Sequence, residues 1–214
     1  MLLDRLTAVL LSLGALAASA GTALAHPHVW VTIRSEVVYA PDGSATAVRH
    51  RWTFDEMFST FAIQGMDAKK PGGLTRDDLA PLAEVNITSL KEFDYFTRAR
   101  AEGKKTPFAE PKDYWLEYKD GALTLTFTLP FKTPVKAKRL SLEIYDPSYF
   151  VDFSLDKKEA ATLVGAPASC TVAAERPREG TAAQAPLGEA FFQNLDASSN
   201  WGAQFANRIS VTCP

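Results

Sequence analysis

Two histidines, His26 and His28, stand on either side of Pro27, directly after the small-residue triplet Ala23–Ala25. A basic residue, an apolar run and such a triplet are typical of a bacterial secretory signal, which predicts cleavage after Ala25. Cleavage there makes His26 the mature N-terminus, where its α-amine and its imidazole can bind one metal ion together. The motif therefore predicts a site for a divalent transition metal (nickel, cobalt, zinc or copper) at His26 and His28.

Three coordination schemes can be compared for this motif. A square-planar chelate of the terminal amine, two deprotonated amides and a third-position imidazole fails in its full form, because Pro27 has no amide proton to lose. A histidine brace, in which a second imidazole joins the amine and imidazole of His26, suits Cu(II) or Ni(II). A mixed site of imidazoles and a carboxylate suits zinc, nickel or cobalt. The brace and the mixed site both stay open.

Strand geometry separates the nearby residues that could supply a further ligand. If the first two predicted strands pair as a hairpin, His28 lies opposite Asp55 or Glu56. His50 then lies opposite Arg34, about 20 Å along the strand from His28. Asp55 and Glu56 are therefore preferred to His50 as metal ligands. Each also has a structural interpretation, since the two carboxylates suit a helix start and His50, between two arginines, suits a half-exposed strand position.

Two further carboxylates, Asp146 and Asp152, belong to an aromatic part of the sequence around Tyr149–Phe153. An acidic side chain buried among aromatic rings needs a partner, and a metal ion is one such partner. Asp146 precedes a proline and is also typical of a turn, and Asp152 has the alternative of pointing outward from a strand. Both are secondary metal-ligand candidates.

Cys170 and Cys213 are the only cysteines in the chain. An even number in an exported protein predicts a disulfide, and the two lack the close spacing of a cysteine zinc site. We expect the bond to tie the last strand to the body of the domain. The Ala- and Pro-rich segment between them, about 174–186, is predicted to be a mobile loop.

Composition limits the function classes. The net charge is −2 and no basic patch is evident, which argues against a nucleic-acid partner. No later stretch approaches the roughly 20 apolar residues that cross a bilayer. No Ser-His-Asp or Cys-His set supports hydrolysis. The sequence thus predicts a signal peptide at 1–25 and a single periplasmic domain at 26–214.

Alternation of polar and apolar residues predicts strands over much of the chain. The turn signals Pro41–Gly43 and Asp120–Gly121 join two pairs of these strands into hairpins. The large aromatic residues are best explained as core and sheet surface. The predicted strands are 28–39, 44–54, 95–102, 114–119, 123–127, 140–145, 149–153, 169–174 and 209–213.

Two principal helices follow from start signals. The segment Thr53–Glu56 has the spacing of a capping box and predicts a helix to about Met66. Thr75 can cap a second helix over 76–93, in which Pro81 is tolerated only in the first turn. The fold class is therefore α+β, mostly antiparallel β, sandwich-like or a curved sheet, with two principal α-helices. Shorter helices are predicted at 157–164 and 187–195.

Four segments together resemble the DUF1007 family, exported bacterial proteins whose biochemistry is unassigned. They keep the same order and extend over essentially the whole predicted mature chain. The resemblance implies a periplasmic protein often encoded beside nickel/cobalt-type membrane transporters, with the histidine motif carrying any metal role. It implies no catalytic residues. The segments are His26–Trp30, Trp52–Phe58, Tyr145–Phe153 and Phe205–Cys213.

Three functions are compatible with these patterns. The first is a periplasmic accessory protein that binds a transition metal for a transport system, with an inner-membrane metal permease as partner. The second is a copper-dependent oxidoreductase, because copper monooxygenases place a terminal histidine brace on a β-rich secreted domain. The third is a metal-free interaction module of a membrane transporter. We expect the first and no enzymatic activity, because no second histidine is securely placed beside His26.

Overall fold

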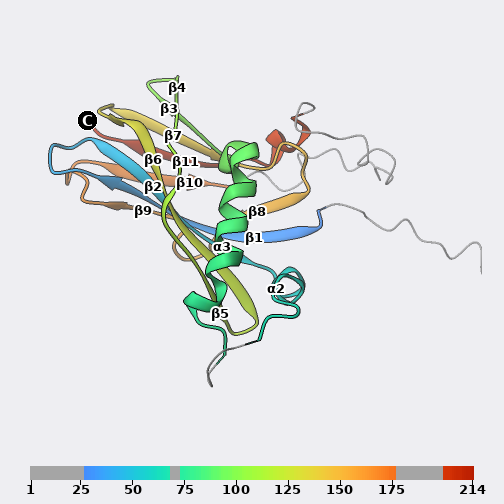
Figure 1. Cartoon of the computed structure of the whole chain (residues 1–214). Helices are drawn as coiled ribbons and strands as arrows, with labels where there is room; N and C mark the ends of the chain where they lie inside the picture. The colour runs from blue at the N-terminus through green and yellow to red at the C-terminus, as the bar shows by residue number, and fades with distance from the viewer. Residues whose placement is uncertain (1–26, 68–72, 177–199) are drawn as a thin grey trace, which may run out of the picture.

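The computed structural model describes residues 27–67, 73–176 and 200–214, which form an α+β domain dominated by strands (Figure 1). The described helices are α2 (Glu56–Ala62) and α3 (Arg76–Leu90), with the 3₁₀ segments η1 (Lys91–Phe96) and η2 (Trp201–Phe205). The strands are β1 (Val29–Tyr39), β2 (Ala45–Phe54), β3 (Thr97–Ala101), β4 (Lys104–Thr106), β5 (Lys112–Lys119), β6 (Ala122–Val135), β7 (Arg139–Ile144), β8 (Val151–Leu155), β9 (Ala161–Val164), β10 (Thr171–Glu175) and β11 (Asn207–Thr212).

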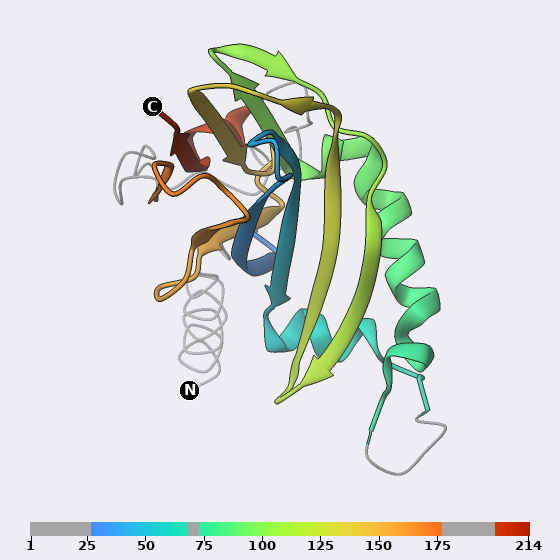
Figure 2. The same ribbon diagram turned by 90° about the vertical axis from the view of Figure 1, so that its left-hand side faces the viewer.

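These strands form two sheets. The first has the order β5-β6-β2-β1-β8, with β9 also beside β1, and the second has the order β10-β11-β7-β3-β4. Pairing is antiparallel except where β8 and β9 run parallel to β1. Figure 2 shows the long, curved β5 and β6 with α3 running along them. The predicted fold class, mostly antiparallel β with two principal helices, is confirmed.

A shared hydrophobic core lies between the sheets. Alternate residues of β1 and β2 point inward, and Val31, Ile33 and Trp52 are at most 1% exposed. They belong to one apolar cluster with Leu142 and Ile209 of the second sheet. Because β1 has neighbours on both edges and one face in this core, the position of its backbone is fixed by packing.

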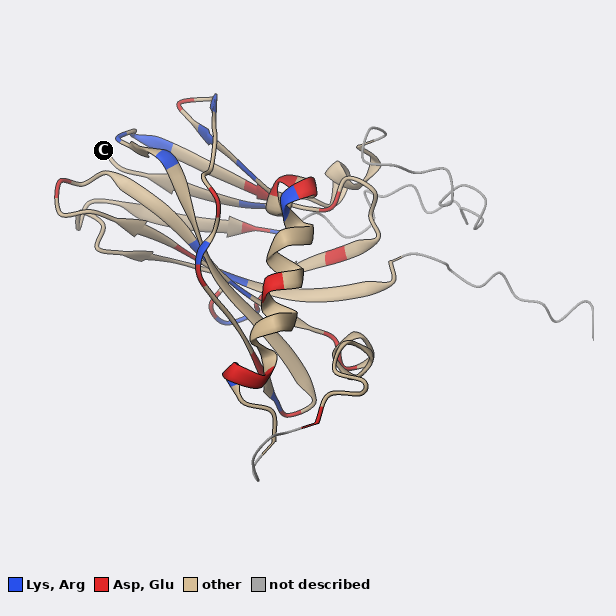
Figure 3. Ribbon diagram, in the orientation of Figure 1, with Lys and Arg blue, Asp and Glu red and all other residues tan. Residues whose placement is uncertain are grey.

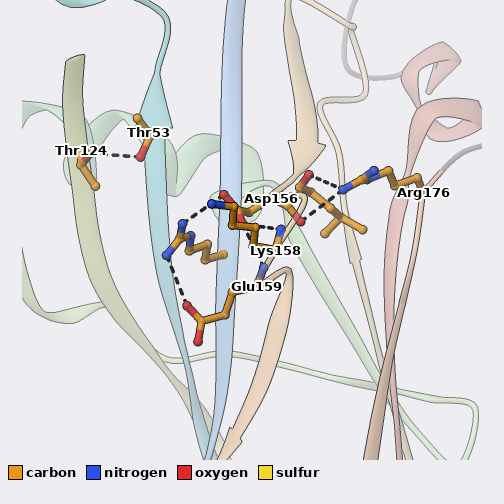
Figure 4. Close-up of polar contacts among 8 residues, drawn as sticks. Thr53, Thr124, Asp156, Lys158, Glu159 and Arg176 are labelled. Carbon is orange, nitrogen blue, oxygen red and sulfur yellow. Dashed lines mark hydrogen bonds and ion pairs between the residues drawn. The ribbon is translucent and has the colours of Figure 1, made fainter. Parts of the chain in front are cut away.

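The two principal helices begin differently from each other. The predicted capping box at Thr75 is confirmed, with Asp78 supplying the second half. The box predicted at Thr53 is wrong, because Thr53 belongs to β2 and its hydroxyl bonds to that of Thr124, as Figure 4 shows. Asp55 caps α2 instead, accepting from the backbone N–H of Phe58 at 2.8 Å.

Helix α3 departs from its prediction at two points. Pro81 lies in the second turn rather than the first, so its missing N–H falls inside the helix. The helix ends at Leu90, before the predicted 93, and continues as η1. Asp94 and Tyr95 adopt left-handed backbone angles, each with φ of 52°, and these angles interrupt the helical path.

The segment 157–164, predicted as a helix, is instead a turn followed by β9. The carboxylate of Asp156 accepts from the backbone N–H groups of Lys158 and Glu159, each at 2.9 Å, which closes the turn (Figure 4). Arg34 on β1 forms ion pairs with Asp156 at 3.1 Å and Glu159 at 3.2 Å. Arg176 donates to the carbonyl oxygens of Leu155 and Asp156. Pairing with β1 therefore overrides the local helical pattern.

Several predictions concern residues outside the described ranges. These are the signal peptide at 1–25, the helix at 187–195 and most of the loop at 174–186, whose first residues belong to β10. Among the residues that the structure describes, no helix is long and apolar enough to cross a membrane.

Candidate metal site at the start of the central strand

His28 lies directly before β1, at the N-terminal end of this strand. Its backbone N–H donates to the carbonyl oxygen of Phe150 at 2.9 Å, which extends the pairing of β1 with β8 by one step. Its exposed imidazole lies against the Phe150 ring, with ring centroids 4.7 Å apart. The sheet thus holds the histidine backbone while the imidazole reaches the surface.

Asp152 lies on β8, beside this histidine. Trp30 and Asp152 are direct partners in the parallel register, so their side chains leave the sheet on one face. His28 directly precedes this strand, two residues before Trp30, and its ring contacts Phe150, two residues before Asp152. The carboxylate accepts no hydrogen bond and forms no ion pair within the described part of the chain.

The surroundings of Asp152 change the ionisation of two groups. Partial burial raises the pKa of the Asp152 carboxyl above its usual range. Burial, together with the negative charge of Asp152, raises the pKa of Tyr149 to about 12. In Figure 3, β8 and α2 carry acidic positions and no basic one. A cation that approached this face would therefore meet a carboxylate with no competing Lys or Arg on these two elements.

Asp55 and Glu56 do not lie opposite His28, so the predicted register is wrong by one position. Asp55 faces Trp30 instead: the Trp30 N–H donates to Asp55 Oδ2 at 3.0 Å, while Oδ1 caps α2. Both carboxylate oxygens of Asp55 are therefore used to join β1 to α2. Glu56 is exposed in the first turn of α2.

His50 is a core residue rather than a half-exposed one, and it lies far from His28. It pairs with Ser35, not Arg34, and is 0% exposed. Its Nδ1 lies 3.0 Å from the Ser35 hydroxyl and its Nε2 lies 3.2 Å from the Thr97 hydroxyl. Burial lowers the pKa of His50 to about 3. Ser35 is seven residues along β1 from His28, about 23 Å at the strand rise, so His50 cannot share a metal ion with it.

Asp146 organises the turn before β8. One carboxylate oxygen accepts from the N–H and the hydroxyl of Ser148, both at 2.8 Å, and the other accepts from the N–H of Val151 at 2.9 Å. Asp146 is 3% exposed. Its turn interpretation is therefore confirmed, and its oxygens serve the backbone.

Donor groups are sparse in this region. Within the described ranges, no group of three or more His, Cys, Asp or Glu side chains is arranged to hold a metal ion. His26 lies outside those ranges, as does any site that it completes. Of the carboxylates predicted as ligands, Asp152 is the one that lies on the strand beside the start of β1 and accepts no hydrogen bond from a described residue.

The disulfide predicted between Cys170 and Cys213 is present. Cys170 precedes β10 and Cys213 follows β11, and the adjacent residues Thr171 and Thr212 are partners in the antiparallel register. The bond therefore ties the last strand to the body of the domain, as predicted. It is consistent with a protein exported to an oxidising compartment.

An apolar groove near His28 was not predicted from the sequence. It has a volume of about 400 Å³ and lies between α3, η1 and the first residues of β1 and β8, with Phe150 on its wall. Its aromatic residues follow strand and helix patterns that are equally typical of a closed core. In the structure, the exposure of Phe93 (40%) and Phe150 (46%) distinguishes this groove from a closed core.

The fold and site define a two-sheet α+β domain with one disulfide, whose central strand begins at an exposed histidine. The chain belongs to the family described as "Protein of unknown function (DUF1007)", which it matches over residues 11–213. It is 25% identical over 193 residues to an uncharacterized protein of Haemophilus influenzae, covering 89% of this chain and 92% of the relative. It is 28% identical over 102 residues to an uncharacterized 15.5 kDa protein of Spirochaeta aurantia, encoded in the trpE 3' region, covering 47% and 73%.

Proposed function

We propose that this protein is a periplasmic accessory protein that binds a divalent transition metal for a metal transport system. The observation that carries the proposal is the position of His28 directly before β1, against Phe150 and close in the chain pairing to Asp152 of the neighbouring strand β8. If the pairing of the two segments continued to His28 and Phe150, His28 and Asp152 would be diagonal neighbours, which lie about 7–8 Å apart in paired strands. An imidazole and a carboxylate can meet at one metal ion across that separation.

Export would create part of the set of groups that bind the metal ion. Removal of residues 1–25 would free the α-amine of His26, and the amine and imidazole of this residue would bind together with the imidazole of His28. Asp152 would add an oxygen, in place of the Asp55 or Glu56 carboxylate expected from the sequence. Such a nitrogen-rich set suits Cu(II), Ni(II), Co(II) or Zn(II) better than Mg²⁺ or Ca²⁺.

The transport role rests on the family. The resemblance to DUF1007 proteins implies a gene neighbourhood with nickel/cobalt-type membrane transporters, so the proposed partner is an inner-membrane metal permease. The metal ion is then the cargo. The role is one of binding and delivery, without a catalytic step.

The first experiment is mass spectrometry of the exported protein, which should begin at His26. Calorimetric titration of that form with Ni(II), Co(II), Cu(II) and Zn(II) should show binding tighter than about 10 μM for at least one ion. The His28→Ala and Asp152→Asn variants should each bind that ion at least about tenfold more weakly. Glu56→Gln is the matched control and should bind like the wild type.

Two outcomes would overturn the proposal. One is the absence of binding tighter than about 10 μM for all four ions by correctly processed protein. The other is binding that neither His28→Ala nor Asp152→Asn weakens. A form with one extra N-terminal residue tests the amine separately, since its affinity should fall when the α-amine of His26 becomes an amide.

A further inference from the structure

The apolar groove beside Phe150 has the properties of a ligand site. Its volume of about 400 Å³ falls in the range of small-molecule pockets, which are lined mainly by hydrophobic and aromatic side chains with a few polar groups. Helix α3 and η1 form one wall, and β1, β2 and β8 form the other. The aromatic residues of its lining are Trp52, Phe54, Phe58, Phe93, Phe96, Phe150 and Phe153.

The charges around the groove favour an uncharged occupant. Among the described residues, no Lys or Arg lines it, and the one acidic residue on its wall, Asp146, uses both oxygens on Ser148 and Val151. Glu92 and Asp94 are exposed on either side of the lining residue Phe93. Lys91 follows the lining residue Leu90, but its ammonium group forms an ion pair with Glu110. A ligand with a carboxylate would therefore meet no cation in the described lining and two acids beside it.

Polar groups on the groove wall would recognise one hydrogen-bonding group on a ligand. The indole N–H of Trp52 is enclosed and has no acceptor among the described residues, so recognition would fall to polar groups that open on the groove. Asn86 and Ser89, one turn apart on α3, also line the groove. The Asn86 amide nitrogen donates to the Leu82 carbonyl oxygen at 2.8 Å, and its side-chain oxygen faces no described donor.

We propose that this groove binds an uncharged amphiphile: a molecule with an aliphatic or aromatic body and one hydroxyl, ether or carbonyl group. The apolar body would lie among the phenylalanine rings, and the polar group would meet Asn86 and Ser89 on α3. This site is separate from the metal site proposed above, although Phe150 lies between the two. Neither binding event requires the other.

The test uses the full exported protein and the neutral fluorescent probe N-phenyl-1-naphthylamine. Its emission should rise on binding, and 1-dodecanol should displace it. Dodecanoate, with the same chain and a carboxylate, should displace it at least about tenfold less effectively. Both competitors are used below the concentrations at which they form micelles, and EDTA is present to remove metal ions.

A matched pair of variants on α3 locates the binding. Ser89→Trp places a large side chain on the groove wall at an exposed position, and it should weaken probe binding at least about tenfold. Thr88→Trp adds the same side chain to the same helix at an exposed residue outside the lining, and it should leave probe affinity unchanged within about twofold. Circular dichroism checks that both variants fold.

The proposal is overturned by three results. They are the absence of saturable probe binding, equal weakening by the two tryptophan variants, and displacement by dodecanoate as effective as that by dodecanol. Light scattering adds a fourth: if the wild type is a dimer and Ser89→Trp is a monomer, the groove is covered by a second copy of the chain. Loss of metal binding in Asp152→Asn, at a residue outside the groove lining, should leave probe affinity unchanged, so the two proposals fail independently.

Discussion

Trp30 and Asp55 are joined by two hydrogen bonds where β1 meets the start of α2. The Trp30 N–H donates to Asp55 Oδ2 at 3.0 Å, and the Asp55 N–H donates to the Trp30 carbonyl oxygen at 2.9 Å. The remaining carboxylate oxygen accepts from the Phe58 N–H at 2.8 Å. One side chain thus fixes the beginning of a helix against the strand that carries His28.

We predict that Asp55→Ala lowers the free energy of unfolding by about 2 kcal/mol, because α2 loses its cap and the Trp30 N–H loses its partner. Asp55→Asn keeps one acceptor oxygen and should cost less. Urea denaturation measures both changes. Glu56→Gln, the exposed neighbour, should stay within about 0.5 kcal/mol of the wild type. An Asp55→Ala variant as stable as the wild type would contradict this role.

His50 should make the protein less stable in acid. Burial lowers its pKa in the folded state to about 3, below the ordinary value of 6.5. Between these values the unfolded chain binds a proton that the folded chain does not bind. The contribution of neutral, buried His50 to the free energy of unfolding is therefore complete above pH 6.5. This contribution is lost as the pH falls toward 3.

We predict that His50→Gln flattens the dependence of the free energy of unfolding on pH between about pH 4 and 6.5. The slope should decrease by up to about 1.4 kcal/mol per pH unit relative to the wild type. The readout is the slope rather than the absolute stability, which also changes because the contacts to Ser35 and Thr97 change. Identical slopes in His50→Gln and the wild type would refute the assignment.

The disulfide should contribute strongly to stability. It closes a separation of 43 residues, for which loop-closure entropy predicts about 3–4 kcal/mol. The double variant Cys170→Ser with Cys213→Ser should therefore unfold at a lower urea concentration by that free energy. A reducing agent should lower the urea concentration at which the wild type unfolds toward that of the double variant. It should leave the unfolding of the double variant unchanged. A wild type insensitive to complete reduction, verified by thiol titration, would contradict the prediction.

Gly202 should tolerate no side chain. Its N–H donates to the Pro147 carbonyl oxygen at 2.8 Å, and a Cβ at this position would overlap the carbonyl oxygen of Asp146. Gly202→Ala should therefore push η2 away from the turn before β8 and lower the free energy of unfolding by about 1–3 kcal/mol. Thermal unfolding measures the change, and Ala203→Ser is the neighbouring control. Equal melting temperatures for the glycine variant and its control would show that the turn adapts.

Local patterns in the sequence were sufficient for many elements of the fold. The alternation in 28–39 and 44–54 predicted β1 and β2 almost to the residue, because the period of a strand with one buried face is visible in the chain itself. Thr75 and Asp78 marked the start of α3 for a similar reason, since a capping box is made within four residues. The helix predicted at 157–164 failed because parallel pairing with β1, distant in sequence, determines that segment.

Residue types and their order were enough to predict the fold class, the family and the disulfide pairing, and they drew attention to the two histidines beside Pro27. Tertiary structure alone decided which other groups accompany this histidine motif. A shift of one residue in the pairing of β1 with β2 moves Glu56 away from His28 and places Asp55 opposite Trp30. The same shift places His50 opposite the buried Ser35 rather than Arg34, because neighbouring residues of a strand face opposite sides. The placement of Asp152 beside β1 depends on a parallel pairing between segments more than a hundred residues apart, which no local period encodes.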